Sequence, residues 1–205
     1  MASETEIVNS ALRKVGDRRI TSIDDTVSSA GVARDVLASE RDDLLQRHPW
    51  NFATTRAQLA LLSAAPVFEF DYAFALPSDY MRTVSVHAGD YGGGDLQYKI
   101  EGVKQADDTY VNAIVCGSNT AYLRYIRRVT DPNIMTPTFR QVLTLRLAAV
   151  FATGIAKSNT LHQLLKEEMR DAMRQAASID GIEDYPERMP DGSWATSRHA
   201  YGRWV

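Results

Sequence analysis

The 205-residue sequence predicts an α+β fold: a four-helix bundle built from both ends of the chain, an inserted antiparallel β-sheet subdomain and an extended C-terminal arm. Two observations predict it. Apolar side chains recur with helical spacing in the first and last thirds of the chain, whereas they alternate with polar ones in the middle third. We expect the bundle over residues 1–62 and 131–181, the sheet over 63–130 and the arm over 182–205.

Two helices are predicted in the first fifty residues. Ser3 can cap the first one with Glu6 at the third helical position, and Gly16 ends it. The second helix begins near residues 28 and 29, and Pro49 ends it because proline has no amide hydrogen and its ring clashes with the preceding turn. We expect its polar side chains to stay in water, namely Arg34, Glu40, Arg41 and Asp43.

The middle third predicts one antiparallel sheet of about five strands, joined largely by hairpins. The stretches between the strands are rich in Gly, Asp, Asn and Ser, the residues that turns favour. The first strand, VFEFDYAFA at 67–75, would place its four aromatic rings on one face. The remaining strands are expected at 82–87, 96–102, 109–116 and 120–128.

Two further helices follow the sheet. Thr136 can cap a helix that starts at Pro137 and runs to about Lys157, and its apolar side chains lie on nearly all sides. Such a helix is expected to be buried at the centre of the bundle. The last helix has a one-sided apolar stripe and ends at Gly181.

The final segment has no helical stripe and is rich in aromatic residues and arginine. Those residue types are enriched in protein interfaces, so we expect an arm that orders on a partner, with a frayed end as the alternative. The residues expected to make this contact are Tyr185, Arg188, Trp194, Arg198, Tyr201 and Trp204.

The bulk composition argues against several classes of protein. With 23 basic and 26 acidic side chains the formal charge is -3, so no overall positive field would attract nucleic acid or an anionic membrane. Cys116 is the single cysteine, which excludes an intrachain disulfide and suits synthesis in a reducing cytosol. The N-terminus has no signal-peptide pattern and the apolar stretch 143–155 is too short to span a bilayer, so a soluble protein is expected.

The stretch RHPWNF at residues 47–52 allows a catalytic and a structural interpretation. His48 could act as a general base, but no acid or nucleophile is tied to it by spacing. The structural interpretation is favoured. In it Pro49 stops the helix, while Trp50 and Phe52 form a plug at the end of the bundle.

No catalytic, cofactor or metal site is predicted elsewhere. The adjacent carboxylates at 24–25, 42–43, 107–108 and 167–168 could supply a glycosidase pair, but solvated surface is the favoured interpretation. The glycines at 92–94 lack the lysine and the helix of a phosphate loop, and Cys116 is expected to be an unreactive strand thiol. A DNA-contacting strand is a further alternative, although alternation divides its charges between two faces: Tyr122, Arg124, Tyr125, Arg127 and Arg128.

Several segments, in order, resemble the tail tubular protein A family, the head-to-tail adaptors of short-tailed phages and related prophage elements. Together they cover most of residues 7–178, while the C-terminal arm matches loosely. The matching segments are VNSALRKVGDRRITSIDD, LLQRHPWNFATTRAQLA, FALPSDYMR, YKIEG, YLRYIRRVTDPNIMTPTF and LRLAAVFATGIAKS.

The resemblance implies a non-enzymatic virion protein located at the head-tail interface. Such a protein forms a dodecameric ring that binds the portal protein on one side and the tail tube or nozzle protein on the other. DNA passes through the bore only as cargo. Some relatives have been described as peptidoglycan hydrolases, so a tail-associated hydrolase is the alternative, although no motif in this sequence supports it.

Overall fold

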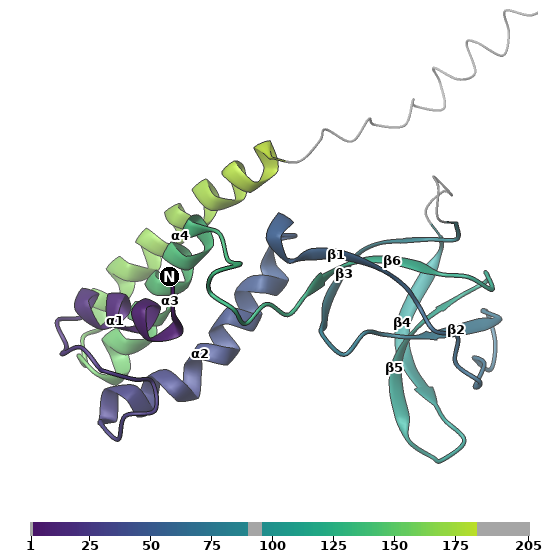
Figure 1. The fold of residues 1–205 in the computed structure, drawn as a ribbon, viewed down its shortest axis with the longest axis horizontal. Coiled ribbons are helices and arrows are strands. Elements are labelled where there is room, and N and C mark those ends of the chain that lie inside the picture. Colours follow the sequence, from purple (N-terminus) through teal and green to yellow (C-terminus); the bar gives the residue numbers. More distant parts are fainter. Residues whose placement is uncertain (1, 90–95, 184–205) are drawn as a thin grey trace, which may run out of the picture.

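The computed structural model describes residues 2–89 and 96–183 of the chain. The α+β prediction is confirmed: helices gather at one end of the molecule and strands at the other (Figure 1). In chain order the elements are α1 (Glu4–Lys14), α2 (Ser28–Arg47), the short 3-10 helix η1 (Asn51–Ala53), β1 (Thr54–Gln58), β2 (Tyr72–Ala75), β3 (Tyr80–His87), β4 (Tyr98–Lys104), β5 (Tyr110–Cys116), β6 (Tyr122–Arg127), α3 (Pro137–Gly154) and α4 (Asn159–Ile182).

The predicted starts and stops of the first two helices are confirmed. The Ser3 hydroxyl accepts a hydrogen bond from the Glu6 amide at 3.1 Å, and Gly16 follows α1 with a φ of 76°, where glycine carries no steric penalty. Helix α2 ends at Arg47, and His48 takes the extended conformation that a residue before proline requires.

Helix α3 is the centre of the helical part, because α1, α2 and α4 all pack against it. Thr136 caps it as predicted and accepts a hydrogen bond from the Phe139 amide at 3.3 Å. Its apolar side chains are buried around the whole circumference, among them Phe139, Leu145 and Phe151. It ends at Gly154, a turn earlier than predicted, while α4 continues one residue past Gly181.

Arg41 does not stay in water as predicted, since only 7% of the residue is exposed. Its guanidinium lies 3.0 Å from Asp42 and 3.5 Å from Glu4, at the start of α1. Glu40 is also partly covered, because it binds Arg146 of α3. The periodicity of α2 could not reveal that other helices lie over its polar side.

The strands form two three-stranded antiparallel sheets, ordered β1-β6-β3 and β2-β5-β4, so the prediction of a single sheet is wrong. Only β4 and β5 form a predicted hairpin. Strands β5 and β6 are consecutive in sequence but belong to different sheets, because residues 117–121 redirect the chain between the two layers. The strand that the sequence analysis missed, β1, pairs with β6 from Thr54 opposite Ile126 to Gln58 opposite Tyr122.

The predicted strand at 67–75 begins only at Tyr72. Glu69 has a φ of 75°, a left-handed conformation that interrupts an extended backbone. Consequently only two of the four aromatic rings share a face, since Tyr72 and Phe74 both pack in the core between the sheets. Phe68 is 79% exposed, Phe70 packs on the outer side of the second sheet, and Phe74 is buried between the two sheets.

The largest core lies among the helices and extends to the first sheet, from which it includes Met81 and Ile126. A second core fills the space between the sheets. Two polar contacts also join the helical and strand-rich parts: Arg82 donates to the Gln46 carbonyl at 3.0 Å, and Arg128 lies 2.9 Å from Asp42.

Candidate interaction surfaces

The corner formed by residues 48–52 is packed from both sides. Trp50 is fully buried, and its indole nitrogen donates to the Leu44 carbonyl at 2.9 Å. Its ring meets the Phe139 ring edge-on with 5.1 Å between centroids, and Phe52 contacts Phe139 at 5.0 Å. These aromatic contacts join the chain segment between α2 and β1 to the central helix α3.

His48 has an acidic partner that the sequence analysis missed. The Asp180 carboxylate is 5% exposed, lies 3.1 Å from His48 Nε2, and accepts the Asn51 amide at 3.2 Å. Asn51 Nδ2 in turn donates to the Asp180 carbonyl at 2.7 Å. One signal was available: Asp180 occupies the next position of the apolar stripe of α4 after Met173 and Ala176.

The network around His48 holds the end of α4 against the corner. Asp180 binds both His48 and Asn51, so its carboxylate is held by structural hydrogen bonds. The described residues also contain no group of three His, Cys, Asp or Glu side chains that could hold a metal ion.

The adjacent carboxylates form ion pairs and turns on the surface. Asp42 binds Arg128, and Glu168 binds Lys14 at 2.8 Å. Asp107 accepts hydrogen bonds from the Thr109 hydroxyl and amide, which lower the pKa of Asp107. In each of the four adjacent pairs at least one carboxylate binds a cation or accepts a hydrogen bond within a turn, which is a structural role.

The arginine and tyrosine side chains of β6 do not form one basic face. Tyr125 is only 5% exposed, and its hydroxyl donates to Asp79 at 2.9 Å. A ring so buried cannot stack on a nucleotide base. Arg128 is paired with Asp42, so part of the positive charge is already neutralised.

Cys116 is fully buried in the core between the sheets. Burial raises the pKa of its thiol, as expected for an unreactive strand cysteine. The glycines at 92–94 and all six residues expected in the C-terminal arm lie outside the described residues: Tyr185, Arg188, Trp194, Arg198, Tyr201 and Trp204.

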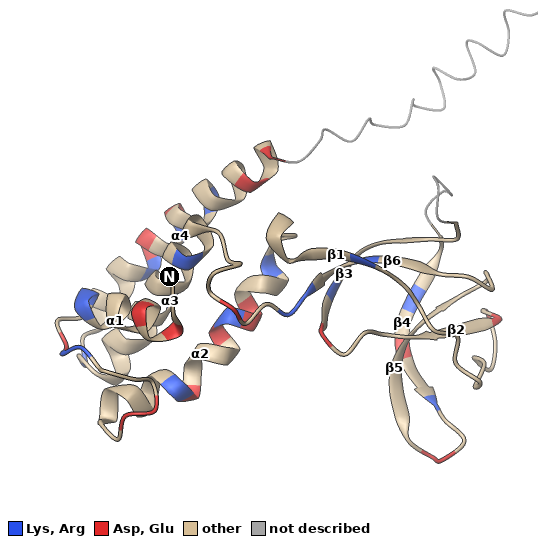
Figure 2. Ribbon diagram, in the orientation of Figure 1, with Lys and Arg blue, Asp and Glu red and all other residues tan. Residues whose placement is uncertain are grey.

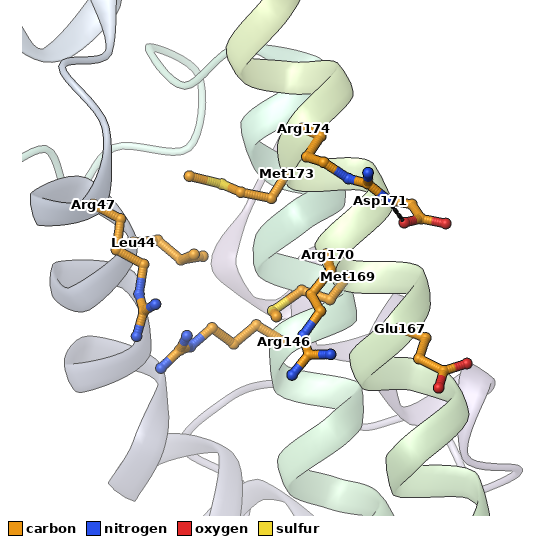
Figure 3. A pocket seen from close by; sticks show the side chains of 9 residues that line it. All are labelled: Leu44, Arg47, Arg146, Glu167, Met169, Arg170, Asp171, Met173 and Arg174. Atoms are coloured by element: carbon orange, nitrogen blue, oxygen red, sulfur yellow. Dashed lines mark hydrogen bonds and ion pairs between the residues drawn. The ribbon is translucent and has the colours of Figure 1, made fainter.

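An open groove of about 490 Å³ lies between α2 and α4, and α3 contributes one side chain to it. We call it the α2–α4 groove. Its apolar lining comes from Leu44 of α2 and from Met169 and Met173 of α4, which face each other in Figure 3. Its polar lining consists of Arg47, Arg146, Glu167, Arg170, Asp171 and Arg174.

Most of the arginines of the groove are already paired. Arg47 and Arg146 both bind Asp43, at 2.8 and 2.6 Å. Arg174 binds Asp171 at 2.5 Å. Arg170 forms no ion pair with any residue that the structure describes, so it supplies a free cation beside the apolar lining.

A second surface lies at the opposite end of the molecule, in the segment that leads into β2. Val67 is 98% exposed, Phe68 79% and Leu61 53%. Adjacent large apolar side chains this exposed are typical of a protein contact. Elsewhere in the ribbon, basic and acidic residues are interleaved along the helices and strands (Figure 2).

These features define a class of protein that acts through its surfaces. The described residues present an apolar groove and an exposed apolar segment, and the buried His48–Asp180 pair is engaged in structural contacts. Among the same residues, none of the helices is long and apolar enough to cross a membrane.

The model of one protein family, described as "Tail tubular protein", matches residues 5–182. The chain therefore belongs to the tail tubular protein family and is a structural component of a phage tail. The family relation predicted from the sequence is confirmed at this level. A comparison with curated proteins gave no match.

Proposed function

We propose that this protein is a head-to-tail adaptor. Its copies form a ring that joins the portal protein to the tail tube or nozzle protein, and the family resemblance implies that the ring is a dodecamer. The family match over residues 5–182 carries this proposal, together with the ordered segments that resemble the adaptors. DNA passes through the bore of the ring as cargo. The subunits are synthesised in the host cytoplasm before they join the virion.

The proposed division of labour follows the three parts of the chain. Residues 1–62 and 131–181 form a helical bundle that supplies the rigid body of each subunit. Residues 63–130 form the inserted strand-rich subdomain. Residues 182–205 form the arm that docks on the portal through Tyr185, Arg188, Trp194, Arg198, Tyr201 and Trp204.

The corner at residues 48–52 acts in this proposal as a structural plug. Pro49 prevents α2 from continuing, and the rings of Trp50 and Phe52 anchor the next segment against Phe139. Asp180 binds the same segment from α4. The plug therefore fixes the direction in which β1 leaves the helices, which a subunit of a closed ring requires.

Electron microscopy of the purified protein mixed with portal protein tests the adaptor role. We expect rings seated on the portal. Deleting residues 186–205 should preserve the far-ultraviolet circular dichroism spectrum and abolish portal attachment. An alanine variant at the exposed Leu164 of α4 serves as the control that should still attach.

Two results would contradict the proposal. Absence of any complex between the full chain and the portal would remove the adaptor role. A truncated chain that fails to fold would instead remove the assignment of residues 182–205 to a separate arm, because the helical part would then depend on them.

A further inference from the structure

The exposed apolar segment before β2 is held in a defined conformation. We call residues 61–71 the Phe68 loop. Its two ends are fastened to the second sheet: the Leu62 amide donates to the Ala73 carbonyl at 2.8 Å, and Lys99 lies 2.6 Å from Glu69. Phe70, next to Glu69, packs against the outer side of the same sheet. These contacts restrict the loop, so less conformational entropy is lost when Val67 and Phe68 bind a partner.

The α2–α4 groove has the matching chemistry. Its apolar lining includes Met169 and Met173, flexible side chains that adapt to a ring and make favourable sulfur-aromatic contacts. At about 490 Å³ it has the size of grooves that accept a few side chains. Leu44, which is 1% exposed, closes its floor.

The two surfaces differ in net charge. Four arginines and two acidic residues line the groove, where Arg170 and Glu167 both lack an ion pair with the described residues. The Phe68 loop carries two acidic residues, Glu69 and Asp71, and no basic one. Asp71, at the end of the Phe68 loop, and Arg170, in the groove, form no ion pair with the described residues. Their charges are opposite. A contact between the two surfaces would bring the Phe68 ring to the methionines and the Asp71 carboxylate to the Arg170 guanidinium.

The two surfaces lie at opposite ends of the molecule, since the Phe68 loop is beside β2 and the groove is on α4 (Figure 1). A loop cannot reach the groove of its own chain. Two different patches that bind each other on successive copies make a heterologous contact, which generates a closed ring or an open filament.

We propose that the Phe68 loop of one copy docks in the α2–α4 groove of the next copy. This contact deepens the proposed function and rests on it, because it is the lateral contact of the proposed ring. It places Phe68 over Met169 and Met173, and it pairs Asp71 with Arg170.

Sedimentation velocity of the full chain over a range of concentrations tests the contact. We expect Phe68→Ser to weaken self-association at least about tenfold, as removal of a buried aromatic anchor does. Leu164→Ser is the matched control, since Leu164 is exposed on α4 but does not line the groove, and it should leave self-association within about twofold of wild type.

Charge reversal identifies the partner as a second copy. Asp71→Arg and Arg170→Asp should each weaken self-association, and the double variant should recover it. An equimolar mixture of the two single variants should also recover association, with the two variants alternating, because the loop of each variant then meets an oppositely charged groove on the other. Lys166→Asp, also on α4 but outside the groove, controls for charge reversal itself.

The possible failures are distinguishable. Wild-type association that is unchanged by Phe68→Ser, or a double variant no tighter than the single ones, overturns the contact and leaves the ring proposal standing. A wild-type chain that stays monomeric at every soluble concentration also overturns the contact. Attachment to the portal, measured separately as above, then still decides the adaptor role.

Discussion

His48 Nε2 lies 3.1 Å from Asp180 Oδ2, although 132 residues separate them in sequence. The same carboxylate accepts the Asn51 amide, so one buried side chain near the end of α4 holds the segment that leaves α2. The contact joins the first and last parts of the described chain.

Replacing this carboxylate tests its structural role. Asp180→Ala should lower the free energy of unfolding by about 1–3 kcal/mol, because the Asn51 amide would lose its acceptor in a largely buried site. Denaturant unfolding measures the change. Asp180→Asn retains one oxygen acceptor and should cost less. Equal losses in the two variants would show that the acceptor oxygen is not what matters.

Trp50→Ala should destabilise the protein by about 3–5 kcal/mol, the usual cost of truncating a large aromatic side chain in a core. Trp50 is 0% exposed and contacts Phe139 and His48 through its ring. The matched control is Phe68→Ala, which removes an exposed ring and should change stability little. A loss below about 1 kcal/mol for Trp50→Ala would contradict the proposed plug.

Stability should fall in strongly alkaline solution because of Tyr125. Burial, followed by the hydrogen bond to Asp79, raises the pKa of Tyr125 from 10.0 to about 12. The folded state therefore keeps the Tyr125 proton at pH values where the unfolded state has lost it. The contribution of this proton to the free energy of unfolding is complete below pH 10 and is lost as the pH rises to about 12.

The expected loss is up to about 3 kcal/mol, measured by denaturant unfolding at a series of pH values. Tyr125→Phe is the control, since it cannot ionise and should remove this part of the pH dependence. If wild type and Tyr125→Phe lose stability in parallel between pH 10 and 12, other groups are responsible.

Cys116 should be unreactive in the folded protein. It is 0% exposed and burial raises the pKa of its thiol, so both access and the thiolate fraction are low. A chromogenic thiol reagent at neutral pH should react rapidly only after denaturant is added. Rapid reaction of the native protein would show that the two sheets separate easily.

The sequence predicted the features that depend on neighbouring residues. Ser3, Thr136 and Pro49 act within a few residues of themselves, so the helix limits they set were predicted correctly or nearly so. Arg41 shows the limit of such reasoning. Arg41 lies on the predicted polar side of α2. Its burial involves Glu4 of another helix, which the sequence of α2 does not predict.

The sheet was predicted less well because pairing is a long-range property. The alternation in each strand gives its two faces but not its partner, so two small sheets could not be distinguished from one. Strand β1, with the sequence TTRAQ, has too little apolar alternation to be seen. Phe68 followed the alternation in sequence, but the backbone turn at Glu69 removed it from the strand.

The candidate surfaces were mostly beyond the sequence. Three helices line the α2–α4 groove, and the hydrophobic periodicity of a single helix does not predict how the three are placed relative to one another. Asp180 could have been noticed in the sequence as a polar residue on an apolar stripe. Its partners at residues 48 and 51 could be identified only from the fold.

The pairing of β1 with β6 has a mechanical consequence. The chain enters the strand-rich part at Thr54 and returns at Ile126, and these two residues lie opposite each other on adjacent strands. A load that pulls the strand-rich part away from the helices is therefore shared by two neighbouring backbone connections that are cross-linked by hydrogen bonds. Both connections would have to yield before the strands could be pulled away from the helices.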